Sequence, residues 1–366
     1  MEADTAATSA GPVVERIDIG RASITLPERQ ISGIHVIDAI ECVLVSLHSS
    51  GHIGCGYAFC FSGNEAAAIE AMAHDLAPSV QGRPVHLVRQ IWADLWRRTN
   101  FIGHAGPALM ALSSLDMALW DLLARTSGQP LYRLLGAVRD EVSVYAAGGW
   151  LSLDLDQLCE QALAAKRAGY PGFKMRAGSA DWRRDVARIT AVREAVGDDL
   201  LLMVDVNQAW DVATAIKAAK RLEELDLTWL EEPVDAHDVA GCARVAAASS
   251  VPIAAGETVW GPHGLVELLR ADAVSVLQPD LMRCGGITGF LTVAHAAEAA
   301  RVRVVSHLYT PISAHLMATL PGSDLVEYIP GWFDPLYSVA PAIEHGRIVL
   351  GDALGAGIAF ASGLQA

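Results

Sequence analysis

From about Val142 onward, the chain alternates between short apolar runs and longer amphipathic segments, and few folds accommodate this alternation. The amphipathic segments, such as 155–170 and 182–197, have the length of helices. Runs that are apolar almost throughout are typical of parallel strands buried on both faces. Eight regular strand–helix units favour a closed (β/α) barrel, with an open, doubly wound sheet as the alternative. The eight runs are VSVYAAG, GFKMR, LLMVDV, LTWLEE, PIAAGE, AVSVLQPD, RVVSHL and LVEYI.

The residues before this repeat have a different texture. Strand-like runs (ECVLVSLHS, HIGCGYAFC) mix with segments of helical periodicity (EAAAIEAMAHDLAPSV, ALMALSSLDMALWDLLARTSG), which indicates an α+β unit with antiparallel strands. We therefore predict an α+β capping domain at 1–137, in which 1–12 form a flexible lead-in, and a barrel domain at 138–343. The last residues, 344–366, are too few for a domain and are expected to pack back on the cap.

Composition and charge argue against some classes of binding partner. The net charge of −15 comes without a basic patch, which argues against nucleic acid. An anionic substrate stays possible because a bound metal reverses the local field. No apolar run has the length that spans a bilayer, and the N-terminus lacks the apolar core of a secretory signal, so we expect no membrane partner. The six cysteines form no CxxC pair and are expected to be free thiols in a cytoplasmic protein.

Three acidic residues at equal spacing indicate a metal site. Asp205, Glu231 and Glu257 each end an apolar run and are separated by 26 and 26 residues. Successive parallel strands would deliver all three carboxylates to one rim of the barrel. Hard oxygen ligands favour a divalent cation, above all Mg²⁺. A lone Asp is more often a helix N-cap and a lone Glu a solvated acid, but three at matched spacing favour the ligand interpretation.

The other strand ends also carry polar groups. Lys174 and Arg176 are two residues apart, so both side chains point the same way from a strand. Alone they would be a surface pair, and a lone His307 would be a core histidine. With Asp280 one strand earlier, catalysis is the better interpretation of His307. The complete set at these strand ends, besides the three acids, is Lys174, Arg176, Asn207, Asp280, His307 and Glu327.

Taken in order, the motifs resemble those of the enolase superfamily and, within it, the mandelate racemase subgroup. The resemblance covers almost the whole chain and rests on LDMALWDLLA, KMR, DVNQAW, WLEEP, AGET, QPD followed by GGITG, SHL with SAHL, and VEY. It implies a modified TIM-type (β/α)7β barrel with an N-terminal α+β capping domain. It also implies one Mg²⁺ per subunit on Asp205, Glu231 and Glu257, a pair formed by His307 and Asp280, and a hydrogen bond from Glu327 to a substrate carboxylate oxygen.

The chemistry that fits these groups is removal of the proton α to a carboxylate. The developing enediolate gathers negative charge, which Mg²⁺ and Lys174 would stabilise. His307 suits the role of base near neutral pH, and Asp280 would fix its tautomer and orientation.

The last residue of KMR, Arg176, separates the possible reactions. Racemases of the subgroup typically resemble Lys-x-Lys, with the second lysine as a base opposite the histidine, whereas this chain has Arg176. Arginine stays protonated at accessible pH and is a poor base. Arg176 is then an electrostatic or substrate-binding group, or it exchanges protons with help from Lys174 and the metal. One-base chemistry favours dehydration of a hydroxylated sugar acid over racemisation. The alternative is a mandelate-like 2-hydroxy acid racemase or epimerase using His307 and Arg176, and the third hypothesis is a non-catalytic metal-binding barrel.

The remaining predictions concern the substrate and the assembly. Asn207, Arg29, Tyr57 and Trp332 are the candidate substrate-binding residues, chosen for their places at strand ends or in cap segments expected to face the barrel mouth. The apolar look of those cap segments suits an aryl acid better than a polyhydroxy acid and keeps the racemase open. We expect a small-molecule carboxylate substrate and a homo-oligomer.

Overall fold

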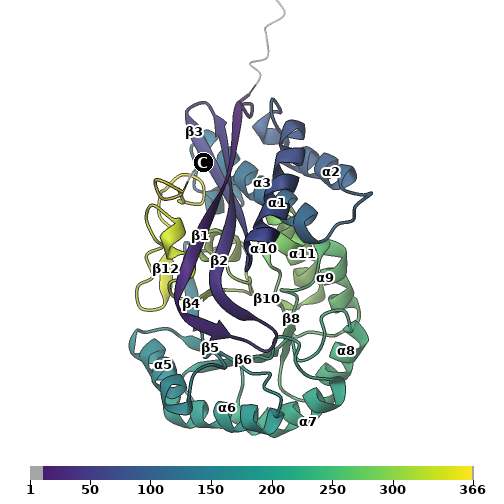
Figure 1. The fold of residues 1–366 in the computed structure, drawn as a ribbon, viewed down its shortest axis with the longest axis vertical. Coiled ribbons are helices and arrows are strands. Elements are labelled where there is room, and N and C mark those ends of the chain that lie inside the picture. The colour runs from purple at the N-terminus through teal and green to yellow at the C-terminus, as the bar shows by residue number, and fades with distance from the viewer. Residues whose placement is uncertain (1–10, 365–366) are drawn as a thin grey trace, which may run out of the picture.

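An antiparallel sheet of three strands, covered by helices, precedes the barrel in the computed structural model, which describes residues 11–364 (Figure 1). The strands lie in the order β1-β2-β3, and the long helix α3 packs on β3 and β2. This confirms the α+β character predicted for the segment. The elements are β1 (Arg16–Ile31), β2 (Val36–Ser49), β3 (His52–Cys60), α1 (Gly63–Leu76), α2 (Val88–Arg98), α3 (Gly106–Thr126) and α4 (Leu131–Leu134).

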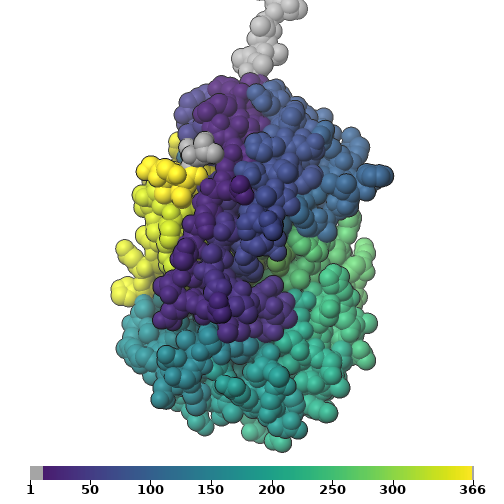
Figure 2. All heavy atoms as spheres, viewed as in Figure 1, coloured from purple at the N-terminus to yellow at the C-terminus, as the bar shows by residue number. Residues whose placement is uncertain are grey.

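The first two strands form a ribbon that reaches the barrel. Figure 2 shows this purple ribbon crossing the face of the molecule onto the teal half. Residues 26–31 belong to β1, with an irregular register between Thr25 and Gln30. The tip of the ribbon lies close against the barrel, because a Cβ on Gly33 would come within 2.5 Å of the carbonyl oxygen of Val206.

The barrel has eight parallel strands in the order β10-β9-β8-β7-β6-β5-β4-β11. A parallel bridge between Ser306 and Val326 joins its two ends and closes the sheet, so the barrel prediction is confirmed and the open sheet is excluded. The strands are β4 (Glu141–Ala147), β5 (Gly172–Arg176), β6 (Leu201–Asp205), β7 (Trp229–Glu231), β8 (Ile253–Ala255), β9 (Val276–Leu277), β10 (Arg303–Val304) and β11 (Leu325–Tyr328).

Helices surround this barrel, and α5 to α8 begin at side-chain caps. The N-cap carboxylates of Asp154, Asp181, Asp211 and Asp238 accept backbone N–H groups at the starts of α5 to α8. Since Asp211 caps α7, Asp205 is not the cap of the helix that follows it. The helices are α5 (Leu155–Arg167), α6 (Trp182–Val196), α7 (Val212–Leu222), α8 (Val239–Ala248), α9 (Gly261–Arg270), α10 (Leu281–Cys284), α11 (Gly286–Ala300) and α12 (Thr310–Met317).

The C-terminal segment contacts both parts of the molecule. Strand β12 (Arg347–Val349) pairs antiparallel with β4 of the barrel. Farther on, the Leu131 N–H donates to the Gly355 carbonyl at 2.6 Å, and the Ala356 N–H donates to Asp121 of α3 at 2.6 Å. The segment thus ties the barrel to the first helices.

The proposed limits of the domains remain predictions. The lead-in predicted at 1–12 falls largely on residues 1–10, which lie outside the described residues.

One helix differs from the expectation that no segment is long enough to span a membrane. Helix α3 qualifies by length and composition, with a mean hydropathy of 1.3, but 78% of that window is buried inside the fold. Its apolar surface is therefore covered by the sheet and the neighbouring helices, as in a core helix.

The six cysteines are all free thiols, as predicted.

Burial of His315 predicts an acid-sensitive fold. His315 in α12 is buried, its Nδ1 accepts the Tyr132 N–H at 3.2 Å, and burial lowers its pKa from 6.5 to about 4. Because the folded state resists protonation, stability is full above pH 6.5 and falls as the pH drops from there toward 4. The loss is roughly 3 kcal/mol at about 1.4 kcal/mol per pKa unit.

Urea titrations between pH 4 and 8 test this expectation. His315→Asn, whose amide retains an acceptor, should flatten the slope below pH 6.5. His237→Asn, at a side chain that is 81% exposed, should leave it unchanged. An unaltered slope in His315→Asn would show that other groups cause the acid sensitivity.

Candidate active site

The strand register brings the three acids together. Arg176 on β5 pairs with Asp205 on β6, and Asp205 pairs with Glu231 on β7, so these residues lie at one level of the barrel. Glu257 lies two residues after the end of β8, beyond Gly256. All three carboxylates are buried, and one oxygen from each lies within 4.8 Å of the others. The equal spacing in sequence therefore becomes a cluster on one rim.

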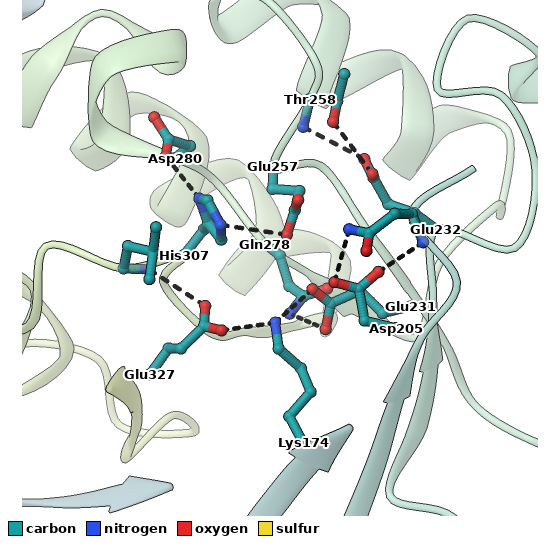
Figure 3. Close-up of polar contacts among 12 residues, drawn as sticks. Lys174, Asp205, Glu231, Glu232, Glu257, Thr258, Gln278, Asp280, His307 and Glu327 are labelled. Carbon is teal, nitrogen blue, oxygen red and sulfur yellow. Dashed lines mark hydrogen bonds and ion pairs between the residues drawn. The ribbon is translucent and has the colours of Figure 1, made fainter. Parts of the chain in front are cut away.

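This cluster has the donor set of a divalent-cation site. Lys174 Nζ lies 2.6 Å from Glu231 Oε1 (Figure 3). Arg176 pairs with Asp205. Glu257 Oε2, in contrast, is buried and accepts no hydrogen bond from a described residue. A buried carboxylate oxygen without a donor is costly, and a cation between the three acids would satisfy it. The residues therefore fit a hard metal ion such as Mg²⁺.

The pKa values of the three acids shift in different directions. Burial raises the pKa of Asp205 although Arg176 opposes it, and burial with the charge of Asp205 raises that of Glu257 well above the ordinary range. At Glu231, burial is outweighed by the charge of Lys174, which holds the pKa at about 2. Neighbouring positive charge thus outweighs burial at Glu231 but not at Asp205 or Glu257.

A histidine–aspartate pair adjoins this cluster. His307 Nδ1 lies 2.6 Å from Asp280 Oδ2, and Nε2 lies 3.4 Å from Glu257 Oε2. Because the carboxylate of Asp280 accepts the Nδ1 proton, Nε2 is left as the basic nitrogen and faces the acidic cluster. Asp280 is itself fixed, since its Oδ1 accepts the Arg283 N–H at 3.0 Å. The predicted pairing of His307 with Asp280 is present in the structure.

Glu327 connects the histidine side to the lysine side. Its Oε1 lies 2.8 Å from Lys174 Nζ, and its Oε2 accepts the Leu308 N–H at 3.3 Å. Lys174 thus stands between Glu231 and Glu327, and Figure 3 shows it rising from its strand between them. The predicted groups at the ends of seven strands, β5 to β11, therefore meet in this site.

A cavity opens onto this set of groups beneath the ribbon tip. Asn207 and Trp332, two of the predicted substrate-binding residues, line it. Asn207 also donates from Nδ2 to Asp205 at 2.9 Å, and Trp332 donates to Gln30 at 2.8 Å. The cavity joins barrel residues to cap residues such as Phe59.

The other two predicted substrate-binding residues lie elsewhere. Arg29 is 63% exposed and pairs with Asp38 across the ribbon, outside the cavity. Tyr57 is fully buried between β3 and residues beyond the cap, where its ring packs on Tyr309 and its hydroxyl lies 2.7 Å from that of Tyr337. Tyr57 and the cavity-lining Phe59 are two residues apart on β3 and face the same side, so strand alternation did not reveal which of the two reaches the cavity.

Several lining residues were missed. Strand alternation would point Glu232 away from Glu231, but its φ of 39° turns the chain, so its side chain lines the cavity and accepts hydrogen bonds from Gln208 and Thr258. Trp150 lies just after the apolar run of β4, beyond Gly148 and Gly149, a position that offered a signal. Its ring stacks on Trp332 at 5.7 Å and lies 5.0 Å from the guanidinium of Arg176.

Comparison with models of protein families shows which family this chain belongs to. A model described as "Enolase C-terminal domain-like" matches residues 157–363, and one for the N-terminal domain of mandelate racemase/muconate lactonizing enzyme matches residues 23–136. The chain belongs to the mandelate racemase/muconate lactonizing enzyme family. The resemblance seen in the motifs is thereby confirmed.

Relatives of this family member carry out related reactions. L-Talarate/galactarate dehydratase from Salmonella typhimurium is 36% identical over 290 residues, 79% of this chain and 73% of that protein. A 3,6-anhydro-alpha-L-galactonate cycloisomerase from Streptomyces coelicolor is 33% identical over 349 residues, 94% of this chain and 96% of that one. A crystal structure of a lysine-to-alanine mutant of L-talarate/galactarate dehydratase, with Mg and L-glucarate, superposes with a TM-score of 0.94. It is 31% identical, and the match covers 100% of this chain and 95% of that one.

Proposed function

We propose that this family member is a Mg²⁺-dependent dehydratase of a hydroxylated sugar acid. The observation that carries the proposal is the presence of one base on one face of the site. His307 is oriented by Asp280 at 2.6 Å, whereas the last residue of KMR is Arg176, which is held by Asp205 and Trp150. Names of relatives, among them dehydratases acting on sugar acids, support the same class.

The reaction follows from the placement of the side chains. His307 Nε2 takes the α-proton of the bound acid, while Asp280 holds the resulting imidazolium in place. Lys174 supplies positive charge beside the developing oxygens, and Mg²⁺ on Asp205, Glu231 and Glu257 adds to it. His307 then returns the proton to the departing β-hydroxyl, which leaves as water. The enol product becomes a 2-keto-3-deoxy acid.

Glu327 is proposed to act on the carboxylate of the substrate. It lies between Lys174 and the backbone of Leu308 at the edge of the acidic cluster. An acid bound there would meet Lys174 and Glu327 together, so the two groups would fix the reacting carboxylate against the base. Asn207 and Trp332 are proposed to contact the rest of the substrate.

Cycloisomerisation is a second candidate, because the cycloisomerase relative aligns with 94% of this chain. The two candidates differ in the leaving group, which is water in one and a ring oxygen in the other. Offering purified, Mg²⁺-loaded protein a library of sugar acids and anhydro acids separates them. Formation of 2-keto-3-deoxy acids from open-chain acids supports dehydration, and turnover of anhydro acids alone would overturn it.

Arg176→Lys tests whether this residue sets the reaction. A lysine can lose its proton where an arginine does not, so the variant should gain a second base opposite His307. In this variant we expect exchange of the α-proton with solvent deuterium from both α-configurations of the acid, measured by NMR in D₂O. In the parent protein we expect exchange from one configuration only. Arg176→Met, which has no ionisable group, is the control and should gain no exchange. Exchange from both configurations in the parent protein would instead favour the racemase, with Arg176 as its second base.

The expectations about the substrate, the cellular location and the assembly are also part of this proposal. The substrate is a small carboxylate, the protein acts in the cytoplasm, and the chain assembles with copies of itself. Light scattering of the purified protein measures the last of these directly.

A further inference from the structure

Arg283 is a cation of the cavity that the mechanism does not use. It lies on α10, three residues after Asp280, and lines the same cavity as His307 and Glu257. Its Nη1 donates to the carbonyl oxygen of Glu257 at 2.9 Å, and its guanidinium lies 5.6 Å from the ring of Trp260. The side chain is therefore held at the rim by a backbone contact and an aromatic ring.

One edge of this guanidinium has no partner. Nε is buried, and within residues 11–364 neither Nε nor Nη2 makes a hydrogen bond or an ion pair. The other arginine of the cavity differs, because Arg176 pairs with Asp205 and lies 3.9 Å from Glu327. A free Nε–Nη2 edge is the edge that binds a carboxylate through two parallel hydrogen bonds.

Within residues 11–364, no hydrogen bond or ion pair joins Arg283 to the groups assigned to the reacting carboxylate. Those groups are Lys174 and Glu327, whereas Arg283 reaches toward Thr258, whose hydroxyl is 3.5 Å from Nη1. In the view of Figure 3, Thr258 and Lys174 lie on opposite sides of the acidic cluster. His35 of the ribbon tip also lines the cavity and feels the charge of Arg283. The cavity therefore has one set of polar groups at Lys174 and Glu327 and a second set at Arg283 and Thr258.

We propose that Arg283 binds a second carboxylate of the substrate, so that the preferred substrates are dicarboxylic sugar acids. The inference rests on the proposed function for the first carboxylate. A molecule with a terminal hydroxymethyl group in place of that carboxylate leaves the Nε–Nη2 edge unpaired, and its binding is weaker. Arg283 is then the residue that separates aldaric from aldonic acids.

Matched pairs of acids test this. Galactarate and galactonate share their configuration and differ only in the terminal carboxylate, and the same holds for the other hexaric and hexonic acids. We expect the best diacid to exceed its monoacid partner about 100-fold in kcat/KM, since charge-assisted pairs contribute on the order of 10- to 150-fold. In Arg283→Gln the ratio should fall to near one. Arg270→Gln, at an exposed arginine paired with Glu267, should keep the full ratio.

Binding separates this proposal from the proposed function. Calorimetry on Mg²⁺-loaded His307→Asn protein measures both acids without turnover, so a preference for the diacid is detectable even if no acid is dehydrated. Mg²⁺ affinity and the melting temperature of Arg283→Gln should stay near those of the parent. Equal binding of diacid and monoacid in every pair overturns the proposal. An equal loss of binding affinity for diacid and monoacid in Arg283→Gln also overturns the proposal. It would indicate that Arg283 contacts the reacting carboxylate or supports Glu257.

Discussion

Replacing His307 with asparagine is expected to lower turnover by roughly 10⁴-fold while leaving the affinity for Mg²⁺ nearly unchanged. The imidazole is the group whose basic nitrogen faces the acidic cluster, and its other nitrogen is held by Asp280 at 2.6 Å. Asparagine keeps a neutral polar side chain of smaller size and offers no base. Steady-state assays with the best acid of the screen, together with calorimetric titration of Mg²⁺, measure the two quantities.

Two variants sharpen this result. Asp280→Asn keeps a side chain that can hydrogen-bond the imidazole but removes the charge that stabilises the imidazolium, so an intermediate loss is expected. His237→Asn, far more exposed, should behave like the parent protein. Full activity in His307→Asn would refute its role as the base, and a large loss of Mg²⁺ affinity would indicate that the histidine supports the metal site instead.

Removing one ligand of the acidic cluster should have the second large effect. In Glu257→Gln we expect Mg²⁺ affinity to fall at least about 100-fold and turnover by about 10⁴-fold at fixed Mg²⁺, because a charged ligand becomes neutral. Chelation of the parent protein should abolish turnover and be reversed by added Mg²⁺. Calorimetry and activity assays over a Mg²⁺ series provide the measurement.

The same variant should stabilise the metal-free protein. Glu257 is buried near Asp205 and Glu231, and its Oε2 has no donor, so removing its charge relieves repulsion when no cation is present. The melting temperature without Mg²⁺ should rise, and the increase on adding Mg²⁺ should shrink. Glu232→Gln is the matched control, since it changes the neighbouring carboxylate outside the triad and should keep Mg²⁺ affinity within about tenfold. Equal losses in both variants would contradict the assignment of the triad.

The barrel and most of its rim were predictable from the sequence for one physical reason. Parallel strands buried on both faces leave long apolar runs, and their carboxyl ends share an edge, so the polar residues that end the runs must meet. Asp205, Glu231 and Glu257 follow this rule, as do His307 and Asp280. Periodicity thus carries information about both the strands and the edge on which their last side chains lie.

The rest depended on geometry that periodicity does not encode. Arg29 and Tyr57 were chosen from cap strands whose placement over the barrel was unknown; the structure turns Arg29 to solvent and buries Tyr57 against Tyr309 and Tyr337, outside the cavity. Glu232 reaches the cavity through a left-handed turn, although strand alternation would point it away from Glu231. Arg283 lies on a short helix after a strand, where no alternation indicates direction. Its unpaired edge is visible only in three dimensions.

The most direct test of single-base dehydration is deuterium exchange at the α-carbon in D₂O. Mg²⁺-loaded protein is incubated with both α-configurations of each acid that it turns over, and substrate and product are followed by NMR. We expect exchange or turnover from one configuration only, with loss of water and formation of a 2-keto-3-deoxy acid. Exchange from both configurations without loss of water would contradict the proposal and identify a racemase.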